Sequence, residues 1–183
     1  VGLMRAHHAV LSYDWTMSRK IRFKAETYYQ YLFNIPVKGN IASPFSMANY
    51  GADFGIPRED SLANTGVGTN YGLELTLERA FSDHYYFLLT STLYSSQYRA
   101  SDGVWRNTAF NGSYVCNLLT GFELSTSKKG NSMFSTDGRF IIAGGNRYTP
   151  IDIAASNAAG QEVLRTNQIY AAQFPAYYRL DLK

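Results

Sequence analysis

The chain has 183 residues, of which 15% are aromatic and only 17% are charged. Globular proteins carry about 25% charged residues, so this chain is unusually poor in charge and rich in aromatic side chains. The formal net charge of +3 is too small to indicate a nucleic-acid partner. A single cysteine, Cys116, excludes an internal disulfide framework. The sequence has no run of about 18 apolar residues, so it predicts no transmembrane helix.

Alternating apolar and polar residues predict seven β-strands. They cover residues 6–17, 20–33, 68–80, 84–99, 112–125 and 138–148, and the seventh begins near Ala176. Most of them exceed the five or six residues that are typical of globular strands. A tilted strand of about 9–11 residues crosses the hydrocarbon core of a bilayer, so these lengths suit a membrane barrel. Because the chain ends inside the seventh strand, we expect it to be a fragment of a longer protein.

The stretch "NYGLELTLERAFSDHYYFLLTSTLY" shows the alternation most clearly. Its first strand would place Tyr71, Leu73, Leu75 and Leu77 on one face. The opposite, polar faces of the predicted strands would carry Glu26, Glu74, Glu78, Glu123, Arg139 and Arg147. This pattern fits a soluble sheet over a core, or a barrel with lipid outside and these charges in its lumen. In the next strand, residues 84–99, neither face is cleanly apolar, so the sequence does not decide which face points inward.

The connections between the strands alternate in length. "SRK", "SDH" and the longer "TSKKGNSMFSTD" join strands in pairs, whereas residues 34–67, 100–111 and 149–175 form the other connections. Short and long connections would therefore lie at opposite ends of the sheet, as in outer-membrane barrels. Tyr and other aromatic residues also crowd the strand ends. They indicate membrane-interface girdles, or only the preference of Tyr for β-sheets.

Motifs for catalysis and for metal binding are missing from the sequence. "GVGTNYG" resembles a dinucleotide-binding loop, but its last glycine is one position late and a strand follows, so we expect a loop entering a strand. His7 and His8 are adjacent and would point to opposite faces of a strand, while His84 lies in a turn. No nucleophile and base pattern occurs. We therefore expect no enzymatic activity, no cofactor and no metal site.

Two long connections carry candidate ligand-binding residues. "NIPVKGNIASPFSMANYGADFGIPRED" includes Tyr50 and Phe54 and is too aromatic for a disordered linker. "SDGVWRNTAFN" offers Trp105, Arg106 and Asn107, which suit stacking on a sugar or pairing with an anionic group. The alternative is that Trp105 only anchors its own loop.

"NYGLELTLERAFSDHYYFLLTSTLYSSQYRASDGVWRNTAFNGSYVCNLLTGFE", "GGNRYTPID" and "QFPAYYRLDLK" resemble the C-terminal part of the barrel of Bacteroidetes-type TonB-dependent outer-membrane receptors. The resemblance implies an antiparallel transmembrane barrel of about 22 strands, to which this chain contributes seven. It also implies a location in the outer membrane of a Gram-negative bacterium, in contact with lipid. An N-terminal plug domain of the same full-length protein and the TonB complex would lie outside this chain.

The same resemblance implies import of a scarce nutrient: a siderophore, a cobalamin-like compound, an oligosaccharide or a peptide. The loops around Tyr50, Trp105 and residues 151–174 would then face the ligand. Two alternatives come from the residues themselves. A soluble β-sheet ligand-binding module would pack its apolar faces together as a core, and a passive porin or a barrel enzyme would share the membrane architecture without TonB.

Overall fold

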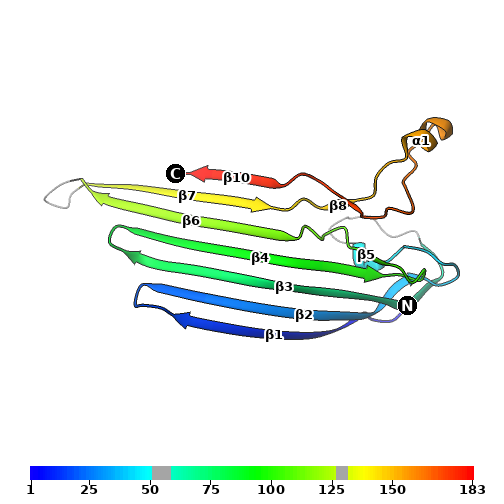
Figure 1. The fold of residues 1–183 in the computed structure, drawn as a ribbon, viewed down its shortest axis with the longest axis horizontal. Coiled ribbons are helices and arrows are strands. Elements are labelled where there is room, and N and C mark those ends of the chain that lie inside the picture. Colours follow the sequence, from blue (N-terminus) through cyan, green and yellow to red (C-terminus); the bar gives the residue numbers. More distant parts are fainter. Residues whose placement is uncertain (51–58, 127–131) are drawn as a thin grey trace.

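A computed structural model describes residues 1–50, 59–126 and 132–183, which form an antiparallel β-sheet with loops gathered at one end (Figure 1). The strands of the main sheet are β1 (Arg5–Thr16), β2 (Ile21–Lys38), β3 (Leu62–Ser82), β4 (Tyr85–Arg99), β5 (Trp105–Asn107), β6 (Tyr114–Ser125), β7 (Met133–Ala143) and β10 (Tyr177–Leu182). Their order is β1-β2-β3-β4-β6-β7-β10, with β5 paired to β4 alone. The prediction of an all-β fold is confirmed.

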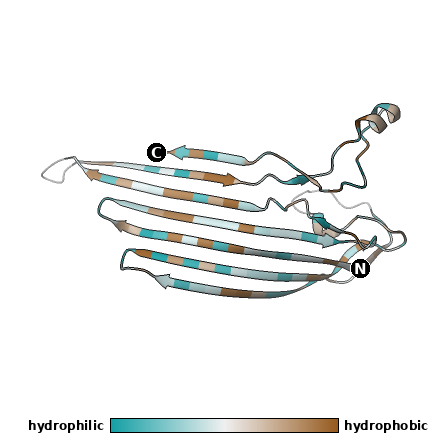
Figure 2. Cartoon of the chain, viewed as in Figure 1, coloured by the Kyte–Doolittle hydropathy of each residue, from teal (hydrophilic) through white to brown (hydrophobic). Residues whose placement is uncertain are grey.

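The strand register assigns every strand an apolar and a polar face, and Figure 2 shows the alternating hydropathy along the strands. Directly opposed residues of neighbouring strands point to the same side of a sheet. Leu73 on β3 lies opposite Thr27 on β2 and Leu93 on β4, and Leu77 lies opposite Leu89. The register therefore settles the side of β4 that the sequence left open. We call the side with Leu73, Leu77, Leu89 and Leu93 the apolar face, and the other side the polar face.

The apolar face is uncovered within the described residues. Tyr71, Leu73 and Leu93 remain 47%, 39% and 55% exposed, although all three lie in the middle of the sheet. The buried hydrophobic side chains instead lie where the loops begin, and they are Ile35, Val37, Tyr98 and Ala100. The long part of the sheet is thus a single layer.

The short turns fold as the sequence predicts. Asp83 and His84 connect β3 to β4 with φ values of 51° and 78°, the left-handed conformation that two-residue hairpin turns require. Lys20, in the turn between β1 and β2, places its Nζ 2.7 Å from Asp83 Oδ2. This ion pair joins two adjacent turns at the end of the sheet opposite the long loops, so the predicted separation of short and long connections is confirmed (Figure 1).

Four predicted boundaries are wrong by five residues or more: both ends of the strand at 138–148, the start of the strand at 68–80, and the end of the strand at 20–33, which is β2 and continues to Lys38. The strand expected at residues 138–148 is β7, which begins at Met133 and ends at Ala143. Just after its end the backbone of Gly144 lies close to that of Gly112, where a Cβ would be 1.8 Å from the carbonyl oxygen of Gly112. "GVGTNYG" lies inside β3 instead of in a loop, because β2 and β3 stay paired as far as Lys38 and Leu62.

The long connections contain regular structure that the sequence analysis missed. They include the 3-10 helix η1 (Met47–Asn49), the helix α1 (Ile153–Ala159) and a second sheet of β8 (Arg147–Tyr148) and β9 (Ala172–Gln173). Asp152 caps the start of α1 by accepting a hydrogen bond from Ala155 N, and Gly160 ends it with a φ of 66°. Among the described residues, no helix is long and apolar enough to cross a membrane.

Candidate functional site

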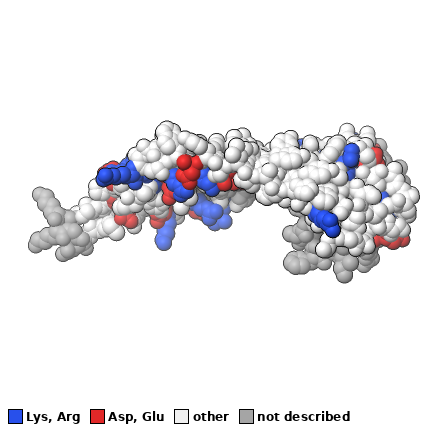
Figure 3. All heavy atoms as spheres, turned by 90° about the horizontal axis from the view of Figure 1, so that it is seen from below, with Lys and Arg blue, Asp and Glu red and all other residues white. Residues whose placement is uncertain are grey.

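Three loops meet at one end of the sheet (Figure 1), and the side view shows that the molecule is thicker there than along the sheet (Figure 3). Their described residues are 39–50 and 59–61, 100–113, and 144–176, and we call them together the loop cap. Each loop grows out of a pair of neighbouring strands, so the strand order β2-β3-β4-β6-β7-β10 fixes where the loops emerge.

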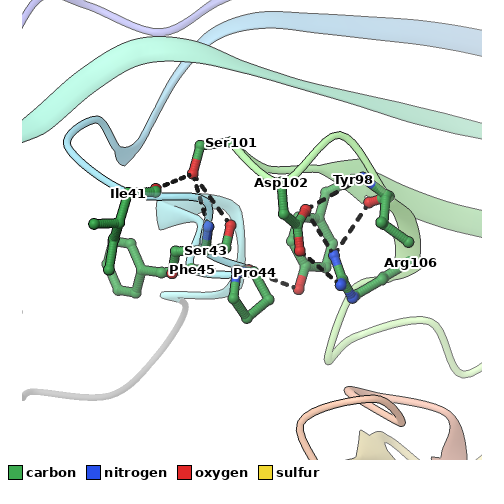
Figure 4. A network of polar contacts seen from close by, with 9 residues as sticks. Ile41, Ser43, Pro44, Phe45, Tyr98, Ser101, Asp102 and Arg106 are labelled. Carbon is green, nitrogen blue, oxygen red and sulfur yellow. Dashed lines mark hydrogen bonds and ion pairs between the residues drawn. The ribbon is translucent and has the colours of Figure 1, made fainter.

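Hydrogen bonds join the first loop to the second (Figure 4). Ser101 Oγ accepts from Ser43 N at 3.1 Å and lies 3.1 Å from Ile41 O, to which it can donate. Asn49 Oδ1 accepts from Ala109 N at 3.0 Å. These contacts connect residues about 60 positions apart in sequence, so the first loop is held against the second by side chains rather than by a sheet.

The third loop is fastened to the second by two long polar side chains. Arg147 Nε donates to Asn111 O at 3.1 Å. Gln173 Nε2 donates to Gly112 O and to Gly145 O, both at 3.0 Å. All three acceptors are backbone carbonyls, so these side chains satisfy polar groups that the irregular backbone would leave without partners. The loop cap is therefore one connected unit.

The loop cap and the end of β4 line an open cavity of about 440 Å³, within the range of about 300–1,000 Å³ found for small-molecule sites. From the first loop it is lined by Ser43, Pro44, Phe45, Ser46, Asn49 and Tyr50. The other lining residues are Tyr98, Thr149, Leu164, Thr166, Ile169 and Tyr170. Among the described residues, no charged side chain lines this loop-cap cavity. Its wall consists of aromatic rings, aliphatic groups, hydroxyls and one amide.

Tyr98 forms the inner wall of the cavity at the end of β4. Its side chain is fully buried, its hydroxyl donates to Pro44 O at 3.0 Å, and its ring meets Tyr170 edge-on at a centroid distance of 6.4 Å. Burial raises the pKa of Tyr98 to about 12, because the ionised phenolate would lose its hydration. Tyr98 thus joins a strand, the first loop and the third loop.

Arg106 was a predicted ligand residue, but the structure pairs it within its own loop. Its guanidinium contacts both carboxylate oxygens of Asp102, at 3.0 and 2.7 Å, and the two side chains are only 15% and 17% exposed. Burial alone would raise the pKa of Asp102, but the hydrogen bonds from Arg106 and from Val104 N hold it below its usual value. Arg106 therefore fixes the second loop and does not line the cavity.

The other predicted ligand residues divide between the cavity and its surroundings. Tyr50 lines the cavity and is 40% exposed. Asn107 accepts a hydrogen bond from Asn111 at 2.8 Å, and Trp105 lies under the Arg99 guanidinium at 5.5 Å from its ring centroid, both outside the lining. Phe54 lies outside the described residues. Sequence reasoning missed Phe45, Tyr98, Thr166 and Tyr170, because the first loop, the end of β4 and the third loop contribute them separately.

The predicted lumen residues lie on the polar face, with one exception. Glu26 forms an ion pair with Lys24 and lies directly opposite Glu74, while Glu78 lies opposite Arg22. By register, Glu123 on β6 and Arg139 on β7 share this face. Arg147 does not, because β7 ends before it. Figure 3 shows charges of both signs interspersed over the short-turn half of the sheet.

Within residues 1–50, 59–126 and 132–183, no group of three or more His, Cys, Asp or Glu side chains could hold a metal ion. Comparison of the chain with protein-family models, with curated proteins and with solved structures finds no match.

Proposed function

We propose that this chain is part of the wall of a transmembrane β-barrel in a TonB-dependent outer-membrane receptor. One observation carries the proposal: no described residue covers the apolar face of this single-layer sheet of long strands. Monomeric soluble proteins rarely expose a contiguous apolar patch larger than a few hundred Å². Covering such a face stabilises the fold by about 25 cal/mol per Å² of apolar surface, and lipid would provide that cover.

The different structures at the two ends of the sheet support its proposed place in a membrane barrel. Short turns end one side, and the loop cap with its cavity ends the other, which is the arrangement of bacterial outer-membrane barrels. The polar face, with Glu26, Glu74, Glu78, Glu123 and Arg139, would then face the lumen and the plug domain. The loop cap would meet the ligand outside the cell, and the TonB complex would drive its import.

A soluble module would need a second layer over the apolar face. The described residues supply none, since the helix α1 and the small β8-β9 sheet both lie at the loop end (Figure 1). The sheet also has β1 and β10 as its two outer strands, so further strands are needed to pair both edges. A barrel of about 22 strands provides these pairings.

Fractionation of cells that express the complete coding sequence around these residues tests the proposal. We expect the protein in the outer-membrane fraction, with a folded form that runs faster than the heated form in gel electrophoresis. A protein that is folded and monomeric in buffer without detergent would contradict the proposal.

A further inference from the structure

We infer that the loop-cap cavity binds a neutral oligosaccharide. This inference rests on the proposed function for the direction of transport, but the binding itself is argued from the chemistry of the cavity wall. The described lining residues bear no charge, although charged residues occur elsewhere in the loop cap.

Three charged side chains of the loop cap already have partners within the protein. Asp102 and Arg106 bind each other through two contacts, and Arg147 donates to backbone carbonyls. A charged ligand in the cavity would lose hydration without gaining a counter-charge from the described wall, and such an uncompensated burial costs several kcal/mol. An anionic metal chelate or a phosphate ester is therefore a poor match for this site.

The aromatic side chains suit flat apolar surfaces. Phe45 and Tyr50 form a tilted pair with centroids 6.0 Å apart, and Tyr50 keeps 40% of its surface exposed. Tyr98 and Tyr170 form a second pair in the lining of the cavity. The C–H face of a sugar ring packs on such rings, and the tyrosine hydroxyls add hydrogen-bonding groups beside them.

The remaining polar groups suit hydroxyl ligands. Thr166 makes no hydrogen bond within the described residues, and it lies in the cavity wall. Asn49 uses its Oδ1 to hold Ala109 N, which orients its amide at the same wall. Neutral donors and acceptors between aromatic rings match a ligand that combines hydroxyl groups with apolar ring faces. An uncharged oligosaccharide has this combination of groups.

Calorimetric titration of the complete detergent-solubilised receptor tests the inference. The probes are neutral gluco-, manno- and galacto-oligosaccharides, an oligogalacturonate as the acidic counterpart, and an uncharged peptide of similar size. We expect at least one neutral oligosaccharide to bind saturably and the oligogalacturonate not to bind. Tighter binding of the acidic sugar, binding of the peptide alone, or no binding of any probe would overturn the inference.

Two variants and one control locate the binding. Tyr50→Ala removes an exposed ring from the cavity and should weaken binding about tenfold or more. Thr166→Lys places a cation in the wall and should weaken neutral binding while permitting the oligogalacturonate to bind. Trp105→Ala removes a ring of similar exposure outside the cavity, 43% against 40%, and should leave affinity unchanged. Equal effects of Tyr50→Ala and Trp105→Ala would also overturn the inference.

The proposed function is tested by assays other than ligand binding. Outer-membrane fractionation and heat-modifiable migration need no ligand, so they are measured on the same protein and on each variant. A receptor that passes both assays but binds no neutral oligosaccharide leaves the membrane proposal intact and removes only the ligand class.

Discussion

The hydroxyl of Tyr86 on β4 donates to Asp137 Oδ1 on β7 at 2.7 Å, across the intervening strand β6. The ring can cross there because it lies over Gly121: a Cβ on Gly121 would be 2.1 Å from the ring atom Cε1 of Tyr86. One tyrosine therefore connects three strands on the polar face.

Gly121→Ala should destabilise the sheet. The added methyl group displaces the Tyr86 ring and overpacks the site, which typically costs about 1–3 kcal/mol. The measurement is the urea concentration at which half of the protein is unfolded in micelles, and the gel mobility of the folded form reports the unfolding. Gly138→Ala on β7 is the matched control, because its Cβ would meet only atoms at 3.6 Å. Equal midpoints for the two variants would show that Tyr86 is not held over Gly121.

Tyr86→Phe keeps the ring over Gly121 and removes only the hydrogen bond to Asp137. We expect a smaller loss of stability than for Gly121→Ala, because the packing survives. Tyr71→Phe serves as the control, since the Tyr71 hydroxyl makes no hydrogen bond within the described residues. The urea midpoints of both variants decide the matter, and an unchanged midpoint for Tyr86→Phe would argue against the three-strand connection.

Tyr98 should make stability depend on pH above 10. Its folded pKa of about 12 lies above the unfolded value of about 10, so its contribution is complete below pH 10 and falls as pH rises to 12. Two pKa units correspond to roughly 2–3 kcal/mol. The difference in unfolding free energy between wild type and Tyr98→Phe, measured from pH 8 to 12, should shrink across this interval. A constant difference would mean that the phenol is not buried.

The Asp102–Arg106 pair should hold the second loop in place. Asp102→Asn leaves the Arg106 guanidinium poorly compensated and should cost about 1–3 kcal/mol of local stability. Limited proteolysis should then cut within residues 100–113 faster than in wild type. Asp181→Asn disrupts the exposed Arg179–Asp181 pair, with side chains 59% and 42% exposed, and should have little effect. Faster cutting in both variants would point to a general loss of fold.

The same pair predicts the behaviour of the loop in acid. The folded pKa of Asp102 lies below its unfolded value of about 3.9, so its stabilisation is present above that pH and is lost as pH falls through the folded pKa. Proteolysis by an acid-active protease should therefore accelerate below about pH 4 in wild type, and the Asp102→Asn variant should show no such step.

The sequence predicts the long strands well, because the alternation of apolar and polar residues is a local signal. Pairing in register then places the apolar residues of neighbouring strands on the same face. The sequence predicts the ends of the strands less well where distant residues come together, as at the end of β7, where the backbone of Gly144 lies against that of Gly112, about thirty residues away. The local signals of α1 are present in "IDIAASNAAG", with Asp152 before the helix and Gly160 after it, but the segment lies within the long connection predicted at residues 149–175.

The candidate site was harder to predict than the sheet. Arg106 and Asn107 have side chains that could bind a ligand. Within the loop, however, Arg106 pairs with Asp102 and Asn107 accepts a hydrogen bond from Asn111, each partner lying four positions away. Only Tyr50 among the described candidates lines the cavity. Tyr98 and Thr166 both line it because the end of β4 and the third loop come together there, and no pattern within one segment reveals that arrangement.

Spin labels placed one at a time on residues 71–78 test the central claim, that the apolar face contacts lipid. In a Cys116→Ala background and reconstituted liposomes, labels at Tyr71, Leu73, Leu75 and Leu77 should be relaxed by lipid-soluble oxygen, and labels at Glu74, Thr76 and Glu78 by a water-soluble nickel reagent. Oxygen accessibility should therefore alternate with a period of two residues. Labels that are all accessible to the nickel reagent, or that show no alternation, would contradict a membrane-embedded sheet.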